Sequence, residues 1–180
     1  MNMRAFKENQ ILHIEDDFMW HDELKAILNM SQAVTSFYGS CLVQVISTIN
    51  DEQQDEKVTA EIERLTKEAD NRPTLIHIVS GQVARAFLDK YIPSVIISDT
   101  NFPMNGVKTV EWLAGHGFEN YPLIGLATDP ISKLDETIRT FFLTSNARYF
   151  PKAETNGEGI EKLAQQVVFN AKWTRENYKQ

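Results

Sequence analysis

Residues 94–99 read SVIISD, a short apolar run that ends in an aspartate. Similar apolar runs are spread along the chain at 10–14 (QILHI), 74–79 (TLIHIV), 123–127 (LIGLA) and 147–150 (ARYF). They are rich in β-branched residues and continuous rather than alternating. Strands of this kind are expected when helices cover both faces of a parallel sheet. The five runs therefore predict five buried strands.

The segments between these runs have the apolar spacing of helices. Val83, Phe87 and Tyr91, for example, recur at i, i+4 and i+8. Comparable stripes occupy 107–114, 131–141 and 160–171. This alternation of strand and helix predicts an α/β fold, a doubly wound five-stranded parallel sheet.

One long segment, 31–72, interrupts the alternation between the first helix and the second strand. Its second half has one apolar stripe, from Val58 to Ala69, and a charged opposite side, which indicates a surface helix. Residues 41–49 (CLVQVISTI) fit a helix or a strand. We expect a single domain over 1–180, with 31–72 as an inserted helical element and 173–180 as a C-terminal tail.

Composition excludes several classes of function. The 180 residues include 18 Lys+Arg and 25 Asp+Glu, a net charge of -7, which disfavours binding to nucleic acid or to an anionic membrane surface. The single cysteine cannot form an internal disulfide. The first residues, MNMRAFKENQ, lack the apolar core of a signal peptide. We expect a cytoplasmic protein.

Acidic residues follow two of the predicted strands. The first strand ends in Glu15, Asp16 and Asp17, and the third ends in Asp99. If these strands are neighbours where the strand order reverses, their carboxylates converge and raise one another's pKa. A hard cation such as Mg²⁺ relieves that repulsion, and an aspartate can accept a phosphoryl group.

An ordered set of motifs resembles the receiver domain of response regulators in two-component signalling. The set is Glu15-Asp16, then Asp99 within SDTNFPMNG, then Lys152 within RYFPK. The resemblance covers about 10–172, apart from the insertion. It implies the flavodoxin-like fold of that family, with strand order 2-1-3-4-5.

The resemblance also implies roles for these residues. Asp99 would accept a phosphoryl group from a phosphohistidine on a histidine kinase or a histidine phosphotransfer protein. Glu15 and Asp16, with the Asp99 carboxylate and the backbone carbonyl of Asn101, would hold Mg²⁺. Lys152 would pair with the phosphoryl oxygens. The chain would act as a signalling phosphoacceptor in a phosphorelay rather than as an enzyme.

Two further positions would transmit the phosphorylation. In the family a hydroxyl at the end of the fourth strand contacts the phosphoryl group, and an aromatic side chain near the lysine swings inward. Thr128 and Tyr149 would take these roles. The usual hydroxyl position falls on Ala127, and Ala153 replaces a proline that commonly follows the lysine.

The expected output is a protein–protein contact, since only one helix and a tail are expected after Lys152. The family signals through its fourth helix, fifth strand and fifth helix, to a protein target or a second copy. A predicted buried stripe of Ile131, Leu134, Ile138 and Phe141 would leave Phe142 at its edge or outside it.

Two other interpretations remain open. A pseudo-receiver would share the fold but act as a phosphorylation-independent binding module, which would explain Ala127 and Ala153. A Mg²⁺-dependent phosphohydrolase of the haloacid type would also use an aspartyl nucleophile. That family places its nucleophile after the first strand with an acid two residues later, whereas here Asp99 follows the third strand and Asn101 comes two later.

The four histidines show no convincing metal-binding spacing. His13 and His77 lie inside apolar strands, so we expect them in the core or at a sheet edge. His21 and His116 are expected at the surface.

Overall fold

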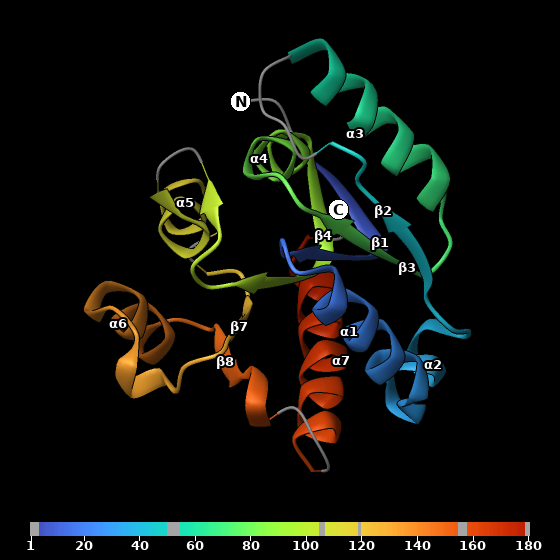
Figure 1. The fold of residues 1–180 in the computed structure, drawn as a ribbon. Helices are drawn as coiled ribbons and strands as arrows, with labels where there is room; N and C mark the ends of the chain where they lie inside the picture. The colour runs from blue at the N-terminus through green and yellow to red at the C-terminus, as the bar shows by residue number, and fades with distance from the viewer. Residues whose placement is uncertain (1–3, 50–54, 105–106, 119, 155–157, 179–180) are drawn as a thin grey trace.

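The computed structural model describes residues 4–49, 55–104, 107–118, 120–154 and 158–178, and its centre is a parallel sheet (Figure 1). Six strands pair in the order β2-β3-β1-β4-β7-β8. These strands are β1 (Ala5–Ile14), β2 (Val43–Ile46), β3 (Thr74–Ile78), β4 (Tyr91–Asp99), β7 (Ile124–Ala127) and β8 (Arg148–Pro151). A small antiparallel hairpin, β5 (Pro103–Met104) and β6 (Val107–Lys108), follows β4.

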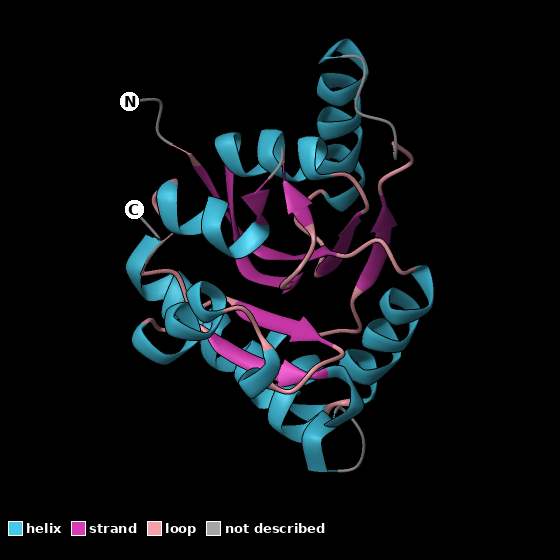
Figure 2. Ribbon diagram, turned by 60° about the vertical axis from the view of Figure 1, so that its left-hand side comes forward, coloured by secondary structure: helices cyan, strands magenta, loops and turns pink. Residues whose placement is uncertain are grey.

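Helices cover both faces of the sheet (Figure 2). One layer contains α1 (Phe18–Met30), α2 (Gln32–Tyr38) and α7 (Glu158–Tyr178). The other contains α3 (Asp55–Ala69), α4 (Gly81–Lys90), α5 (Thr109–Gly115) and α6 (Glu136–Thr144). Short 3₁₀ turns span Ile131–Lys133 and Lys152–Glu154. Within the described residues, no helix is long and apolar enough to cross a membrane.

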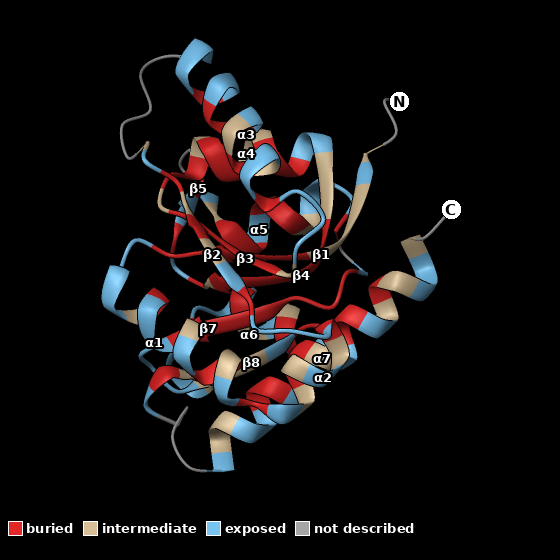
Figure 3. Cartoon of the chain, turned by 90° about the vertical axis from the view of Figure 1, so that its right-hand side faces the viewer, coloured by how far each residue is buried: buried red, intermediate tan, exposed pale blue. Residues whose placement is uncertain are grey.

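The core consists of two apolar layers on either side of the strands (Figure 3). Ile11 on β1 and Leu75 on β3 pack towards α1, α2 and α7. Their neighbours Leu12 and Ile76 pack towards α3, α4 and α5. All five residues of β3 are buried, as expected for a strand covered on both faces. The prediction of an α/β fold with a parallel sheet is confirmed.

The predicted strand count and order are wrong, because the inserted segment contributes a strand as well as helices. Numbered along the chain, the six strands lie in the order 2-3-1-4-5-6. The extra strand is β2, which pairs in parallel with β3 at the edge of the sheet. When β2 is left out, the other five strands follow the order 2-1-3-4-5.

The inserted segment, 31–72, therefore forms α2, β2 and α3 rather than a helical element alone. Residues 50–54 within it lie outside the described residues. The predicted stripe on α3 is confirmed, since Val58, Ile62, Leu65 and Ala69 are all buried. At the other end of the chain, 173–178 continue α7 rather than forming a tail, and 179–180 are not described.

The predicted exposed position of Phe142 is wrong, because α6 begins later than the apolar spacing indicates. Asp135 caps the helix by accepting a hydrogen bond from the Thr137 amide, so Ile131 and Leu134 precede it. The buried pair on α6 is Ile138 and Phe142, four residues apart. Leu143 is the exposed apolar residue of this helix.

Gly81 lets α4 pack directly against the hairpin that follows β4. A Cβ on Gly81 would overlap the Pro103 carbonyl oxygen and lie 2.9 Å from Met104 Cα. Both are backbone atoms, so a rotamer change cannot relieve the overlap. We expect Gly81→Ala to destabilise the protein by about 1–3 kcal/mol in urea unfolding.

Gly115→Ala is the matched control for this prediction. Gly115 ends α5, and a Cβ there would meet no heavy atom within 4 Å. Alanine lowers the entropy of the unfolded chain, so this variant should be neutral or more stable by up to about 1 kcal/mol. Equal stabilities for the two variants would show that the contact between α4 and the hairpin has been misjudged.

Candidate functional site

Two carboxylates and a lysine meet at the carboxyl edge of the sheet, where the strand order reverses. β1 lies between β3 and β4, and doubly wound sheets bind ligands beyond the strand ends at such a point. Glu15 follows β1, Asp99 ends β4 and Lys152 follows β8. Lys152 Nζ lies 2.6 Å from Glu15 Oε2 and 3.0 Å from Asp99 Oδ2. One ammonium group therefore bridges two carboxylates.

Glu15 is the most buried member of this cluster, with 1% of its side chain exposed. Burial raises the pKa of Glu15 to about 7, against the hydrogen bond and charge of Lys152, which lower it. The negative charge of Asp99 adds to the rise. Burial also disfavours the charged form of Lys152, but its bonds to the two carboxylates outweigh this and raise its pKa. The lysine is therefore held as a cation.

Asp99 is more open to solvent, with 18% of its side chain exposed. Its two oxygens have different partners: Oδ2 faces Lys152, and Oδ1 accepts a hydrogen bond of 2.7 Å from the Asn101 amide. Asn101 itself is exposed in the turn after β4. Asp99 is therefore a fixed carboxylate within reach of a molecule from solvent.

The loop from β1 to α1 holds the other two predicted acids. Asp17 caps α1, because its Oδ1 accepts hydrogen bonds from the amides of Met19 and Trp20. The Asp17 amide donates in turn to Glu15 Oε1 at 3.2 Å. Asp16, between them, is exposed. Asp16 and Asp17 are both exposed, but Asp17 is engaged in capping α1.

Glu15, Asp16 and Asp99 carry oxygen donors of the kind that Mg²⁺ prefers. Within the described residues, however, only three histidines bring ligand atoms from three side chains within 4.8 Å of one another. Asp16 and Asp99 offer carboxylate oxygens to solvent, and Glu15 lies behind them. Both Glu15 oxygens already have partners, Lys152 and the Asp17 amide. Each Glu15 oxygen keeps a further lone pair, so these contacts hold the carboxylate in place without blocking a cation.

The predicted switch residues lie on the neighbouring strands. Thr128 follows β7 and is exposed, and within the described residues its hydroxyl has no hydrogen bond. Tyr149, on β8, donates its hydroxyl proton to the Asp129 carbonyl oxygen. Its ring centroid lies 5.4 Å from that of Phe142. Among the described residues, Thr128 therefore has no hydrogen bond to Glu15, Asp99 or Lys152.

Sequence reasoning missed two features beside the cluster. The Lys152 ammonium lies 5.3 Å from the centroid of the Trp20 ring, a cation–π contact from the first turn of α1. His21, expected at the surface, is fully buried and packs with His13 and His77. The burial of His13 and His77 themselves was predicted. A prediction that α1 begins directly after an N-cap at Asp17 would have placed both Trp20 and His21 in the first turn of this helix.

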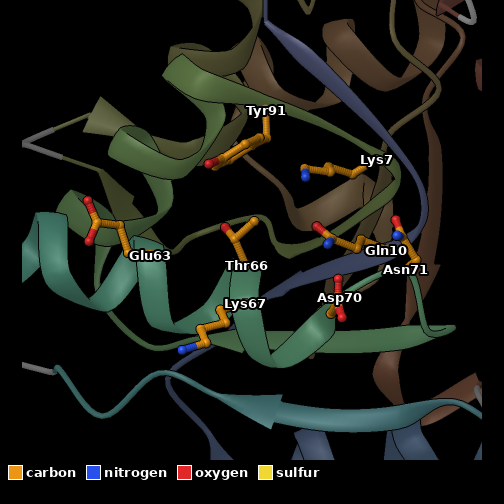
Figure 4. Close-up of a pocket in the computed structure, with 8 residues that line it drawn as sticks. All are labelled: Lys7, Gln10, Glu63, Thr66, Lys67, Asp70, Asn71 and Tyr91. Carbon is orange, nitrogen blue, oxygen red and sulfur yellow. The ribbon is translucent and has the colours of Figure 1, made fainter.

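A separate hollow of about 380 Å³ lies at the opposite, amino end of the sheet (Figure 4). Lys7 and Gln10 on β1 and Tyr91 at the start of β4 line one side, and α3 lines the other. Because it lies away from the strand ends that carry Glu15 and Asp99, this hollow is not part of the candidate site.

Comparisons of the chain with protein-family models, with curated proteins and with solved structures find no match.

Proposed function

We propose that this chain is a phosphoryl-accepting receiver of a two-component or phosphorelay pathway, with Asp99 as the acceptor. The observation that carries the proposal is the bridge from Lys152 to both Glu15 and Asp99 at the strand-order reversal. The order 2-1-3-4-5 of the strands other than β2 also supports a flavodoxin-like receiver fold.

Phosphoryl transfer requires the protein mainly to position the reacting groups and to neutralise their charge. An Asp99 oxygen attacks the phosphorus of a phosphohistidine, the P–O bond forms, and the P–N bond breaks as the histidine leaves. The Asn101 amide orients the carboxylate during the attack. Lys152 then moves its charge from Glu15 to the incoming phosphoryl oxygens, since its flexible stem allows this.

Mg²⁺, when bound, would neutralise the charge that the phosphoryl group adds beside three carboxylates. Glu15, Asp16 and Asp99 would hold it, together with the Asn101 carbonyl. The high pKa of Glu15 matters here, because a protonated Glu15 is a poor ligand. We therefore expect Mg²⁺ affinity to increase as the pH rises through about 7, where Glu15 ionises.

The partner that donates the phosphoryl group would be a histidine kinase or a histidine phosphotransfer protein in the cytoplasm. The output would be a contact with a target protein or a second copy through α6, β8 and α7, the equivalents of the family's signalling face. Since Phe142 is buried, Leu143 is the apolar residue of α6 that such a partner would meet. The chain would not turn over a substrate.

The pseudo-receiver is the second candidate, and one observation favours it. Lys152 and the Asp17 amide each contact one oxygen of Glu15, so groups of the chain itself hold the buried carboxylate. Thr128 is exposed and, among the described residues, has no hydrogen bond to the cluster. Such a site could serve as a fixed ionic core of a binding module.

Acetyl phosphate separates the two candidates. With Mg²⁺ present, the receiver should gain the mass of one phosphoryl group in intact-mass spectrometry, whereas a pseudo-receiver should gain none. Chelation of Mg²⁺ by EDTA should slow the reaction at least about tenfold, because the added charge is then not neutralised. An equal rate in EDTA would contradict the carboxylate metal site.

A further inference from the structure

Three histidine rings form a buried cluster one layer beneath the carboxylate site. His13 on β1 and His77 on β3 are register partners, so their side chains lie next to each other on the face covered by α1. His21 reaches them from α1. All three residues are fully buried, and their ring centroids lie 3.8–5.5 Å apart.

The hydrogen bonds of the cluster leave one nitrogen of each ring without a partner. His77 Nε2 lies 2.6 Å from the Glu15 carbonyl oxygen, and the two Nδ1 atoms of His13 and His21 lie 2.9 Å apart. The remaining atoms, His13 Nε2, His21 Nε2 and His77 Nδ1, are buried with no hydrogen-bond partner in the described structure. Buried polar atoms rarely lack a hydrogen-bond partner, because each such atom lowers the free energy of unfolding by about 1–3 kcal/mol.

The bond to Glu15 fixes which His77 nitrogen is free to bind a ligand. A carbonyl oxygen only accepts, so His77 Nε2 carries the proton and Nδ1 carries a lone pair. Metal-binding histidines usually donate their second ring nitrogen to a carbonyl or carboxylate in this way. In the His13–His21 pair one Nδ1 must donate, which leaves a lone pair on that ring's Nε2. Two of the three free nitrogens are therefore ready-made ligands.

We propose that His13, His21 and His77 form a binding site for a borderline transition-metal dication, with Zn²⁺ as the best-fitting ion. One ligand atom from each residue lies within 4.8 Å of the others. Neutral imidazole suits Zn²⁺, and three histidines with one further position open is an established ligand set for it. The site is separate from the Mg²⁺ site and does not depend on the proposed function.

The protonation state of the cluster leaves its rings able to bind a cation. Burial lowers the pKa of His13, and it lowers that of His21 to about 3, so these rings are neutral near pH 7 and keep their lone pairs. Burial also lowers the pKa of His77, although the charges of Asp22 and Asp16 oppose this. The negative charges of Asp22 and Asp16 attract a cation to the cluster. The positive charges of Lys25 and Lys152 repel it.

Metal binding requires the rings to turn. The three rings are nearly parallel, with interplanar angles of 12–25°, and a shared ion needs their lone pairs to converge. Zn–N bonds of about 2.0–2.1 Å place tetrahedral nitrogens roughly 3.4 Å apart. Binding would therefore break the His13–His21 hydrogen bond and turn the rings about their Cβ–Cγ bonds. Phe18, which is half-exposed, packs edge-on against the His77 ring, with the two ring centroids 5.2 Å apart.

The test titrates Zn²⁺ into the metal-stripped full chain against a chromophoric chelator, with excess Mg²⁺ to saturate the carboxylates. We expect one Zn²⁺ per chain, and the visible spectrum of a four-coordinate ion when Co²⁺ replaces Zn²⁺. His21→Gln should weaken Zn²⁺ binding more than about 100-fold, since a direct ligand matters more than an outer partner. His116→Gln is the matched control, because His116 is exposed and lies outside the cluster.

A second measurement needs no variant. In the wild-type chain, NMR signals of the His13, His21 and His77 rings should shift on Zn²⁺ addition, and those of His116 should not. Asp99→Asn should keep the Zn²⁺ affinity, which separates this site from the carboxylate cluster. The proposal is overturned if Zn²⁺ does not bind at micromolar concentration, if His21→Gln binds it as tightly as wild type, or if only His116 responds.

Discussion

Asp99→Asn is expected to abolish the phosphoryl adduct that acetyl phosphate and Mg²⁺ form on the wild-type chain. Asparagine keeps the shape of the side chain but replaces the nucleophilic oxygen and removes the negative charge. Lys152 keeps its 2.6 Å bond to Glu15, so the local fold should survive. Intact-mass spectrometry over a time course measures the loss, and circular dichroism checks that the variant is folded.

Asp89→Asn is the matched control for acceptor identity. Asp89 is an exposed aspartate on α4, and it makes none of the contacts that position Asp99. We expect its adduct to form at the wild-type rate. An adduct that persists in Asp99→Asn, or disappears in Asp89→Asn, would mean that the acceptor has been misassigned.

The buried strands were predictable because they are covered on both faces. β3 and the second half of β1 are continuous apolar runs, and such runs indicate parallel strands whatever the rest of the fold. The edge strand β2 lacks this signal, since of its four residues only Val45 is buried. β2 forms because the backbone groups at the edge of β3 are available for pairing. The local sequence pattern does not show that such an edge is available.

The carboxylate site was largely predictable, whereas the histidine cluster was not. In any parallel sheet in which β1 and β4 are neighbours, the carboxyl ends of these two strands lie at the same edge. Glu15 and Asp99 follow or end these strands, so they come together there. The histidine cluster depends instead on the register that pairs His13 with His77 and on the rotation of α1 that points His21 inward. Phe142 was misplaced for a different, local reason, because the Asp135 cap shifts the start of α6.

Arg64 and Glu61 hold the inserted segment together, and we expect Glu61→Gln to destabilise the protein strongly. Arg64 binds Glu61 through two nitrogens at 2.8 and 2.9 Å, and it also donates to the Ile46 carbonyl at the end of β2. The Thr48 amide donates to the same carboxylate. The pair therefore joins α3 to β2 and to the chain that follows it.

The pKa of Glu61 sets the size and the pH dependence of the effect. Burial opposes its ionisation, but the bonds from Arg64 and Thr48 outweigh this and hold the pKa at about 2, against an ordinary value of 4.5. Such a shift corresponds to about 3 kcal/mol of folding stability. Because the folded-state pKa is the lower one, this stability is present above pH 4.5 and is lost as the pH falls towards 2.

Urea unfolding of Glu61→Gln and Glu68→Gln tests this prediction, because the two glutamates share Arg64 but differ in burial. The Glu61 side chain is 4% exposed and that of Glu68 is 46% exposed, although Glu68 lies only 2.6 Å from Arg64. Near neutral pH we expect Glu61→Gln to lose about 3 kcal/mol and Glu68→Gln less than about 1 kcal/mol. The difference in the free energy of unfolding between Glu61→Gln and wild type should become smaller as the pH falls below 4.5, because the wild-type carboxylate then takes up a proton. Equal losses for the two variants, or a gap that does not change with pH, would show that the buried ion pair does not anchor α3 to β2.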